Sequence, residues 1–143
     1  MATIQSSLRL YILSLPAITD LIGVRMYAVR GPTPLPTDVN GNPQAYIVYR
    51  FVTIKDANTL SGAPGTSGHL EIEAYAPDYD VAWLITENLR GSQDQPALAY
   101  FKGVMAGGTD VLGCLRIMAY DDNHPQQGMF KVCSEFQISW KLA

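Results

Sequence analysis

Two stretches of alternating residues near the end of the chain constrain its fold more than any other feature. They run from Val111 to Tyr120 and from Met129 to Leu142, with a turn at residues 121–128 between them. In the second stretch every second position is mostly apolar and the positions between are mostly polar, which is the period of a half-buried strand. The pair predicts an antiparallel β-hairpin that forms a wall of the core and carries no active-site signature. Its apolar set is Phe130, Val132, Phe136, Ile138, Trp140 and Leu142.

The same pattern predicts the register of this hairpin. If Leu115 and Ile117 share a face with Val132 and Phe136, the numbers of paired residues must sum to an odd value of about 249. A one-residue slip would move every side chain to the other face, so the register should be strongly specified.

The two cysteines, Cys114 and Cys133, fall on the two strands of the hairpin. The predicted register places Cys114 opposite Glu135 and Cys133 opposite Arg116, which makes the cysteines diagonal neighbours roughly 7–8 Å apart. An undistorted disulfide needs a shorter separation. We therefore expect two free thiols.

Length and composition predict one domain that spans residues 1–143. The chain is 48% hydrophobic and 16% charged, and a chain of this size buries about 68–70% of its unfolded surface. The formal net charge of −3 and the scattered basic residues exclude a general nucleic-acid binder, because affinity for phosphate requires clustered Lys and Arg.

The beginning of the chain has no basic segment typical of a signal peptide, and no apolar run approaches the roughly 20 residues that span a bilayer. We expect synthesis in the cytoplasm and no membrane partner.

A first helix is predicted over residues 3–15, with Thr3 as N-cap and one apolar stripe. Leu10 and Leu13 project from the other side of this helix. Such a second apolar face indicates either complete burial or a helix shared with a neighbouring subunit. Pro16 should start a short turn over residues 17–22 that Gly23 ends.

Strands are predicted over residues 24–29, 45–54 and 69–76, and one more over 98–105. The strand 45–54 is apolar on both faces and should lie centrally in the sheet. Prolines and glycines make residues 31–44 a long loop, and 55–68 should be a second one. The predicted fold class is α+β, with a mostly antiparallel sheet of four to five strands packed by two main helices.

A second helix should begin after Asp78 as N-cap and end at Gly91. Its core stripe consists of Val81, Ala82, Ile85 and Leu89. Tyr79 and Trp83 fall outside this stripe, among polar residues. They indicate either a subunit interface or a second wall of the same core.

No constellation in the sequence supports catalysis or metal binding. The glycines at 62, 65 and 68 precede a strand, whereas a phosphate loop leads into a helix. Cys114, His124 and Cys133 supply only three ligands, from parts of a hairpin that lie apart. Glu71 and Glu73 are an ordinary pair on a solvated strand face. We expect no enzyme activity, no cofactor and no metal.

Four segments together resemble the tail-terminator (tail-completion) family of long-tailed bacteriophages and related particles. They are SSLRLYILSLPAITDLIGVRMYAVRGP, PQAYIVYRFV, HLEIEAYAPDYDVAWLITENLRG and FKVCSEFQISWKLA, and they cover nearly the whole chain in order. The segment 38–44, the linker 92–102 and the hairpin turn depart from the family in length.

The resemblance implies a virion structural protein of the tail–neck region that assembles in the host cytoplasm into a homo-oligomeric ring, a hexamer. Such a ring caps the tail tube, stops the polymerisation of the tail tube protein and contacts a head-side connector or stopper protein. DNA passes through its bore without specific binding, and the acidic balance of the chain agrees with this.

Three sets of residues are candidates for these contacts. The subunit interface would use Leu10, Leu13, Tyr79 and Trp83. The loops that reach the tube or the connector would use Leu35, Val39, Asn40, Leu60 and Pro64. The ring or lumen surface would use Glu71, Glu73, Arg116, Lys131 and Glu135.

Three alternative functions stay open at the sequence level. One is another neck component, either a head-closure protein or a tube-like ring subunit. The second is a small hydrolase or nucleotide-binding enzyme that uses His69, Glu71 or the segment 62–68. The third is a monomeric binding module.

Overall fold

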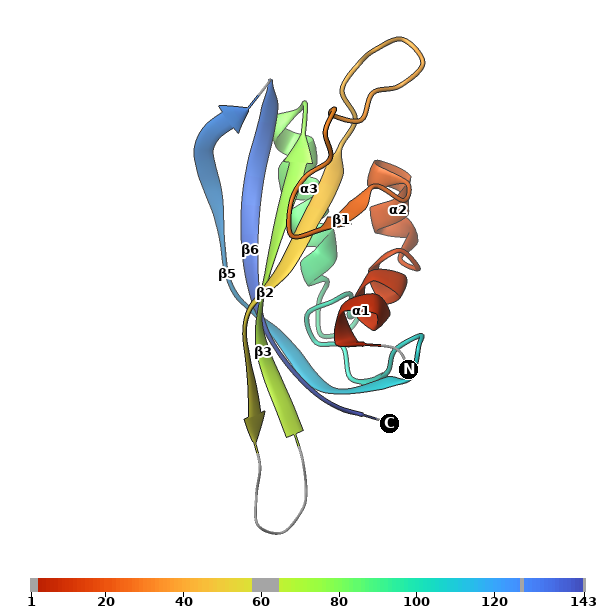
Figure 1. Ribbon diagram of the computed structural model, residues 1–143, viewed down its shortest axis with the longest axis vertical. Helices are drawn as coiled ribbons and strands as arrows, with labels where there is room; N and C mark the ends of the chain where they lie inside the picture. The colour runs from red at the N-terminus through yellow and green to blue at the C-terminus, as the bar shows by residue number, and fades with distance from the viewer. Residues whose placement is uncertain (1–2, 58–64, 127, 143) are drawn as a thin grey trace.

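The computed structural model describes residues 3–57, 65–126 and 128–142, which form an α+β fold of three helices and one six-stranded sheet (Figure 1). The strands lie in the order β1-β2-β3-β6-β5-β4. All neighbours are antiparallel except β1 and β2, which are parallel. The helices are α1 (Ile4–Ile12), α2 (Pro16–Ile22) and α3 (Tyr79–Arg90), and the strands are β1 (Met26–Ala28), β2 (Tyr46–Ala57), β3 (Gly65–Ala76), β4 (Gly103–Val104), β5 (Thr109–Gln126) and β6 (Met129–Leu142).

The α+β class is therefore confirmed, but the sheet is mixed and larger than the predicted four to five strands. The two shortest strands, β1 and β4, have only three and two residues, and they lie within the segments 24–29 and 98–105, for which longer strands were predicted. A third helix, α2, forms where we expected only a short turn, with Pro16 at its first position.

The helices cover one face of the sheet, here called the core face, and leave the other, the open face, largely uncovered by helices (Figure 1). Leu70 and Ile72 of β3 and Phe136 of β6 are fully buried on the core face. Each such side chain contributes about 1.5–3 kcal/mol by burial. Leu8, Ile12, Ile18, Ile22, Ile85 and Leu89 complete this core from the helices.

The predicted N-caps and the end at Gly91 are confirmed, but the first helix ends at Ile12 and not at residue 15. Thr3 accepts a hydrogen bond from the Ser6 backbone N–H, and Asp78 accepts one from that of Asp80. Gly91 ends α3 with a φ of 67°, a conformation that glycine adopts without steric conflict. The α3 stripe is also confirmed in the main, since Ala82, Ile85 and Leu89 are buried, whereas Val81 is half-buried.

The predicted register of the β5–β6 hairpin is wrong. Cys114 lies opposite Ile138, and Cys133 lies opposite Tyr120. The register shifts between Val111 and Gly113 and again between Arg116 and Met118. Each extra residue reverses the alternation of faces along β5.

This reversal changes the positions of the apolar residues and of the cysteines. Leu115 and Ile117 are 59% and 50% exposed, so they do not join the core of Val132 and Phe136. Cys114 packs in the core, while Cys133 pairs with Glu73 on the open face. Both thiols are free, as predicted, but they lie on opposite faces of the sheet and are not diagonal neighbours.

The described residues of the predicted loop 55–68, which are 55–57 and 65–68, are strand and not loop. β2 continues to Ala57 and β3 begins at Gly65, so that the two form a long hairpin, whose residues 58–64 lie outside the described part. Glycine is required at position 68 of this strand, because a Cβ there would lie 2.9 Å from the ring of Phe51 and 3.1 Å from that of Trp140.

Two further strand predictions need correction. β2 lies second from the edge of the sheet, not at its centre, which β3 and β6 occupy. In the segment 98–105 only Gly103–Val104 is a strand, and Leu98 and Ala99 are buried in irregular backbone instead.

The close approach of Gly91 to the next segment gives a stability prediction. A side chain there would meet the Gln95 carbonyl oxygen at 2.8 Å and the backbone nitrogen of Ala97. We expect Gly91→Ala to lower the free energy of unfolding by about 2–4 kcal/mol, the sum of overpacking and backbone strain. Gly41→Ala is the matched control, because Gly41 also has positive φ but no atom within 4 Å. Urea unfolding measures both, and equal losses would contradict the role of the contact.

Candidate assembly surfaces

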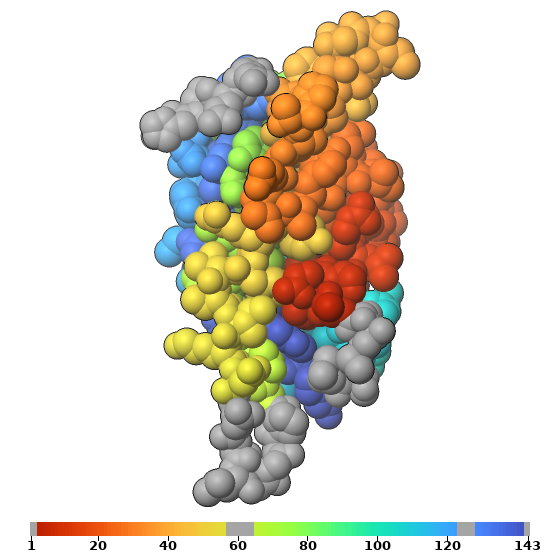
Figure 2. All heavy atoms as spheres, viewed as in Figure 1, coloured from red at the N-terminus to blue at the C-terminus, as the bar shows by residue number. Residues whose placement is uncertain are grey.

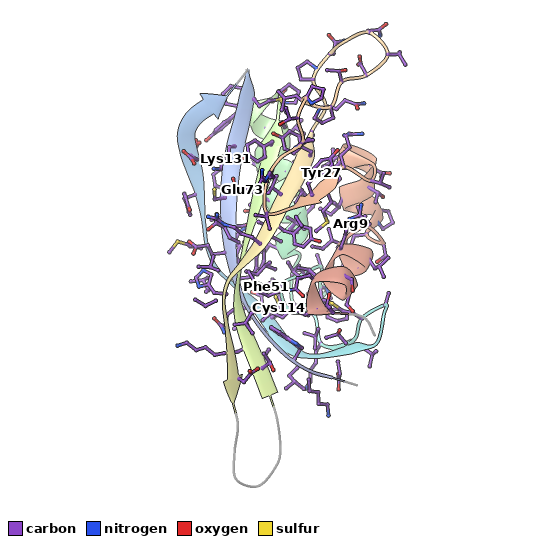
Figure 3. The ribbon with its side chains drawn as sticks, in the orientation of Figure 1. Arg9, Tyr27, Phe51, Glu73, Cys114 and Lys131 are labelled. Carbon is purple, nitrogen blue, oxygen red and sulfur yellow. The ribbon has the colours of Figure 1, made fainter. Side chains whose placement is uncertain are left out.

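Four of the five predicted lumen residues lie together on the open face. Glu71 and Glu73 come from β3, and Lys131 and Glu135 come from β6, at alternating positions of two directly paired strands. Lys131 Nζ lies 2.7 Å from Glu73 Oε2 and 3.1 Å from Asp122 Oδ2. Figure 3 shows Glu73 beside Lys131 on this face.

The remaining carboxylates of the open face also have partners. Glu71 and Glu135 lie opposite each other, a like-charge pairing that is destabilising by itself. Arg50 Nη2 lies 3.1 Å from Glu71 Oε1, and His69 Nε2 contacts Glu135 Oε1. Each carboxylate thus has its own partner, which offsets the repulsion.

Two tyrosines extend this network. The Tyr75 hydroxyl donates to Glu73 Oε2 at 2.7 Å, and its ring stacks on Tyr46 with centroids 4.7 Å apart. Burial, and then the bond to Glu73, raise the pKa of Tyr75 above its ordinary range. Burial by itself lowers the pKa of Lys131 because it disfavours the charged ammonium group. The hydrogen bonds from Lys131 to Glu73 and Asp122 outweigh this effect, so that the pKa of Lys131 is raised overall.

The thiols are unsuited to nucleophilic chemistry. Burial raises the pKa of Cys133 to about 11 and that of Cys114 to about 12. The thiolate is the reactive form of cysteine, so at neutral pH both groups remain protonated.

Arg116, the fifth predicted lumen residue, lies on the core face. It pairs with Phe136 in the sheet, and its Nη1 lies 2.8 Å from Glu87 Oε1 of α3. The hydrogen bond from Arg116 lowers the pKa of Glu87, whereas burial raises it. The hydrogen bond has the larger effect, so the pKa of Glu87 is lowered overall. The bulge after Arg116 is the reason for the different face.

The predicted interface residues divide into exposed and packed pairs. Leu10 is 50% exposed, and Tyr79 is 41% exposed with its ring edge against Phe130. Leu13 and Trp83 are half-buried and pack against the core. For Trp83 the interpretation as a second wall of the core therefore describes its position, and replacing it would disturb folding as well as any interface.

The predicted contact loop contains a structured arm at residues 36–44, which protrudes at the top of Figure 1. Asp38 Oδ1 accepts the backbone N–H groups of Asn40 and Asn42, and these bonds lower the pKa of Asp38. Val39, at the tip, is fully exposed. Leu35, at the base, packs beside Tyr46, Val48 and Met129. Leu60 and Pro64, the other predicted loop residues, lie outside the described residues.

A shallow cavity of about 410 Å³ opens at the base of the arm. It lies between the segment 31–35 and the rings of Tyr46 and Tyr75. Backbone and aromatic surfaces form its walls, and none of the described residues that line it is charged.

The sequence did not reveal that part of β5 and part of β2 expose a row of apolar side chains. On β5 the residues Leu115, Ile117, Met118 and Tyr120 are 42–59% exposed, and on β2 the residues Val52 and Ile54 are 52% and 45% exposed. Apolar strand residues are typical of a core, so a strand pattern alone gave no sign that they face solvent.

Within residues 3–57, 65–126 and 128–142, no group of three or more potential metal ligands comes together. None of the helices described is long and apolar enough to cross a membrane.

Comparison with known proteins gives a likeness of fold. No protein-family model matches the chain, and no curated protein matches it. A chain of the solved structure "Virion of native gene transfer agent (GTA) particle" matches with a TM-score of 0.67 and 16% sequence identity, over 98% of each chain. The two chains share a fold. The likeness runs from end to end, so it includes both the helical layer and the whole sheet.

The raised pKa values predict sensitivity to alkali. A group whose pKa is higher in the folded state contributes stability below its ordinary pKa and loses it as pH rises. The ordinary values are 9.0 for cysteine and 10.0 for tyrosine, so we expect the free energy of unfolding to fall from about pH 9 upward. Urea titrations across this range measure the loss.

A double variant, Cys114→Ala with Cys133→Ala, should delay this loss to about pH 10, where the tyrosines begin to titrate in the unfolded chain. Tyr75→Phe should reduce the slope above that point. A stability that stays constant up to about pH 11 would contradict the burial of these groups.

Proposed function

We propose that this chain is a structural virion protein that forms a homo-oligomeric ring, a hexamer, at the head-proximal end of a tail tube. The ring caps the tube, stops its polymerisation and joins it to the head-side connector around a bore for DNA. The observation that carries this proposal is the likeness, over 98% of both chains, to a chain of a gene transfer agent virion.

The surfaces of the chain support an assembly role. Exposed apolar residues gather on β2 and on β5, toward the two lateral margins of the sheet. Such groups are typical of protein interfaces. The charges of the open face are paired and partly buried, so they provide a stiff surface for contact with a partner.

The open face is also suited to line a bore. Three carboxylates, Glu71, Glu73 and Glu135, lie on this face; Arg50 binds Glu71, Lys131 binds Glu73, and Glu135 contacts only His69 among the ion pairs of the described residues. A face with this balance does not offer the clustered free cations that hold phosphate. DNA could pass along it without being retained.

The arm 36–44 is suited to reach the tube or the connector. Its turn is already closed by the Asp38 bonds, so little conformational entropy is lost when a partner binds. The side chain of the tip residue Val39 is fully exposed, so it is available for contact with a partner.

Electron microscopy of tail tubes tests the function directly. Tubes assembled from the tube protein of the same particle should stop growing when the purified chain is added, and each should carry a cap at one end. Binding along the tube wall, or growth that continues at both ends, would contradict the terminator role. Binding to the portal side alone would indicate a head-closure protein.

Substitution at the arm gives a second test. Val39→Asp should lower the fraction of capped tubes about tenfold, the effect of about 1.4 kcal/mol in binding, without changing the melting temperature. Val104→Asp is the matched control, since Val104 is 64% exposed on β4, away from the arm. Equal capping by both variants would exclude the arm from the contact.

A further inference from the structure

One side of β5 is open along most of its length. β4 pairs only with Asp110 and Val111, and the Tyr100 backbone N–H donates to the Cys114 carbonyl at 2.7 Å. In the part of the chain that the structure describes, no strand pairs with this side of β5 beyond Cys114. We call residues 115–121 the β5 edge.

The far side of β2 is open in the same way. β1 pairs with Ile47–Tyr49, and the last backbone bond on this side runs from the Val29 N–H to the Tyr49 carbonyl. We call residues 50–56, for which no described strand is a partner on this side, the β2 edge. Figure 2 shows β2, in yellow, at the surface beside α1.

Both edges expose apolar side chains next to their unpaired backbone groups. Val52 and Ile117 stand at register shifts of β2 and β5, and both are at least half exposed. An open apolar strand edge promotes pairing with another chain, and single-chain proteins usually protect it. These two edges are therefore candidate sites for pairing with a strand of another chain.

The charges beside the two edges are opposite in sign. The β2 edge carries Arg50 and Lys55 against Asp56 alone, and Arg30 follows Val29, which is bonded to Tyr49 at the start of this edge. The β5 edge carries Asp121 against Arg116, and Asp122 follows directly after it. Like edges would bring like charges together, whereas unlike edges bring opposite charges together.

Some of these charges are already bound within the chain. Arg50 binds Glu71, Asp122 binds Lys131 and Arg116 binds Glu87. When these three pairs are set aside, the side of the β2 edge stays positive and that of the β5 edge stays negative, so the complementarity does not depend on them.

We propose that the β5 edge of one copy pairs with the β2 edge of the next copy, so that the sheets of neighbouring subunits join through backbone hydrogen bonds. The occupant of each edge is a second copy of this chain. The contact is heterologous, and repeated rotation closes it into a ring. This inference rests on the proposed ring and extends it by naming the strands that would form its subunit contact.

Two variants, each blocking one edge, test the pairing. Variant A carries Ile117→Lys and Met118→Lys on the β5 edge, and variant B carries Val52→Lys and Ile54→Lys on the β2 edge. All four positions are 45–52% exposed, so folding should persist, as circular dichroism would verify. The wild-type chain should sediment as an oligomer, and each variant alone as a monomer of 15.7 kDa.

An equimolar mixture of A and B should then double in mass, because A keeps a working β2 edge and B keeps a working β5 edge. Val24→Lys, at a position 72% exposed and outside both edges, is the control for added charge and should keep the wild-type mass. A wild-type monomer at every soluble concentration, an oligomer of A or B alone, or a mixture that stays monomeric would each overturn the pairing. If A does not fold, Leu115→Lys, at a position 59% exposed, replaces it.

The mass measurement separates this inference from the proposed function. Edge pairing with no effect on tail tubes would leave the contact standing and remove the terminator role. If the wild-type chain caps tubes and variant A still forms an oligomer, the terminator role would stand and the edge pairing would be overturned.

Discussion

The unbroken register between β3 and β6 is the constraint on which the rest of the structure depends. It runs from Thr66 opposite Trp140 to Ala76 opposite Phe130 without a shift. It places Leu70 beside Phe136 on the core face and Glu73 beside Cys133 on the open face. A slip of one residue would exchange these faces, so the helical layer and the charged surface both follow from this one pairing.

The neighbouring strands keep this register only in part, and their departures explain what the sequence could predict. The faces of β6 and the caps of α3 follow from local rules that act within a few residues. The caps are confirmed, and the apolar face of β6 is confirmed for Val132, Phe136, Ile138 and Trp140, whereas Phe130 is 40% exposed. The bulges of β5 have no comparable local signature, because Leu115 and Ile117 resemble core residues in isolation. Their exposure is decided by tertiary pairing.

The candidate surfaces show the same division. The alternation of β3 and β6 was enough to bring Glu71, Glu73, Lys131 and Glu135 together, whereas the bulge moved Arg116 to the other face. The open edges were not predictable in this way. Whether a strand has a neighbour depends on the order of all strands in the sheet, which no single segment encodes.

The brevity of β1 has a consequence of its own. Its three residues and the single Tyr100 contact set where the unpaired stretches of β2 and β5 begin. They therefore limit the number of backbone hydrogen bonds that a strand of a neighbouring subunit could form in the proposed pairing. In the proposed pairing, lengthening β1 by a few residues would shorten the unpaired stretch of β2 and weaken self-association while the core stayed intact, so that the strength of assembly would be set separately from folding.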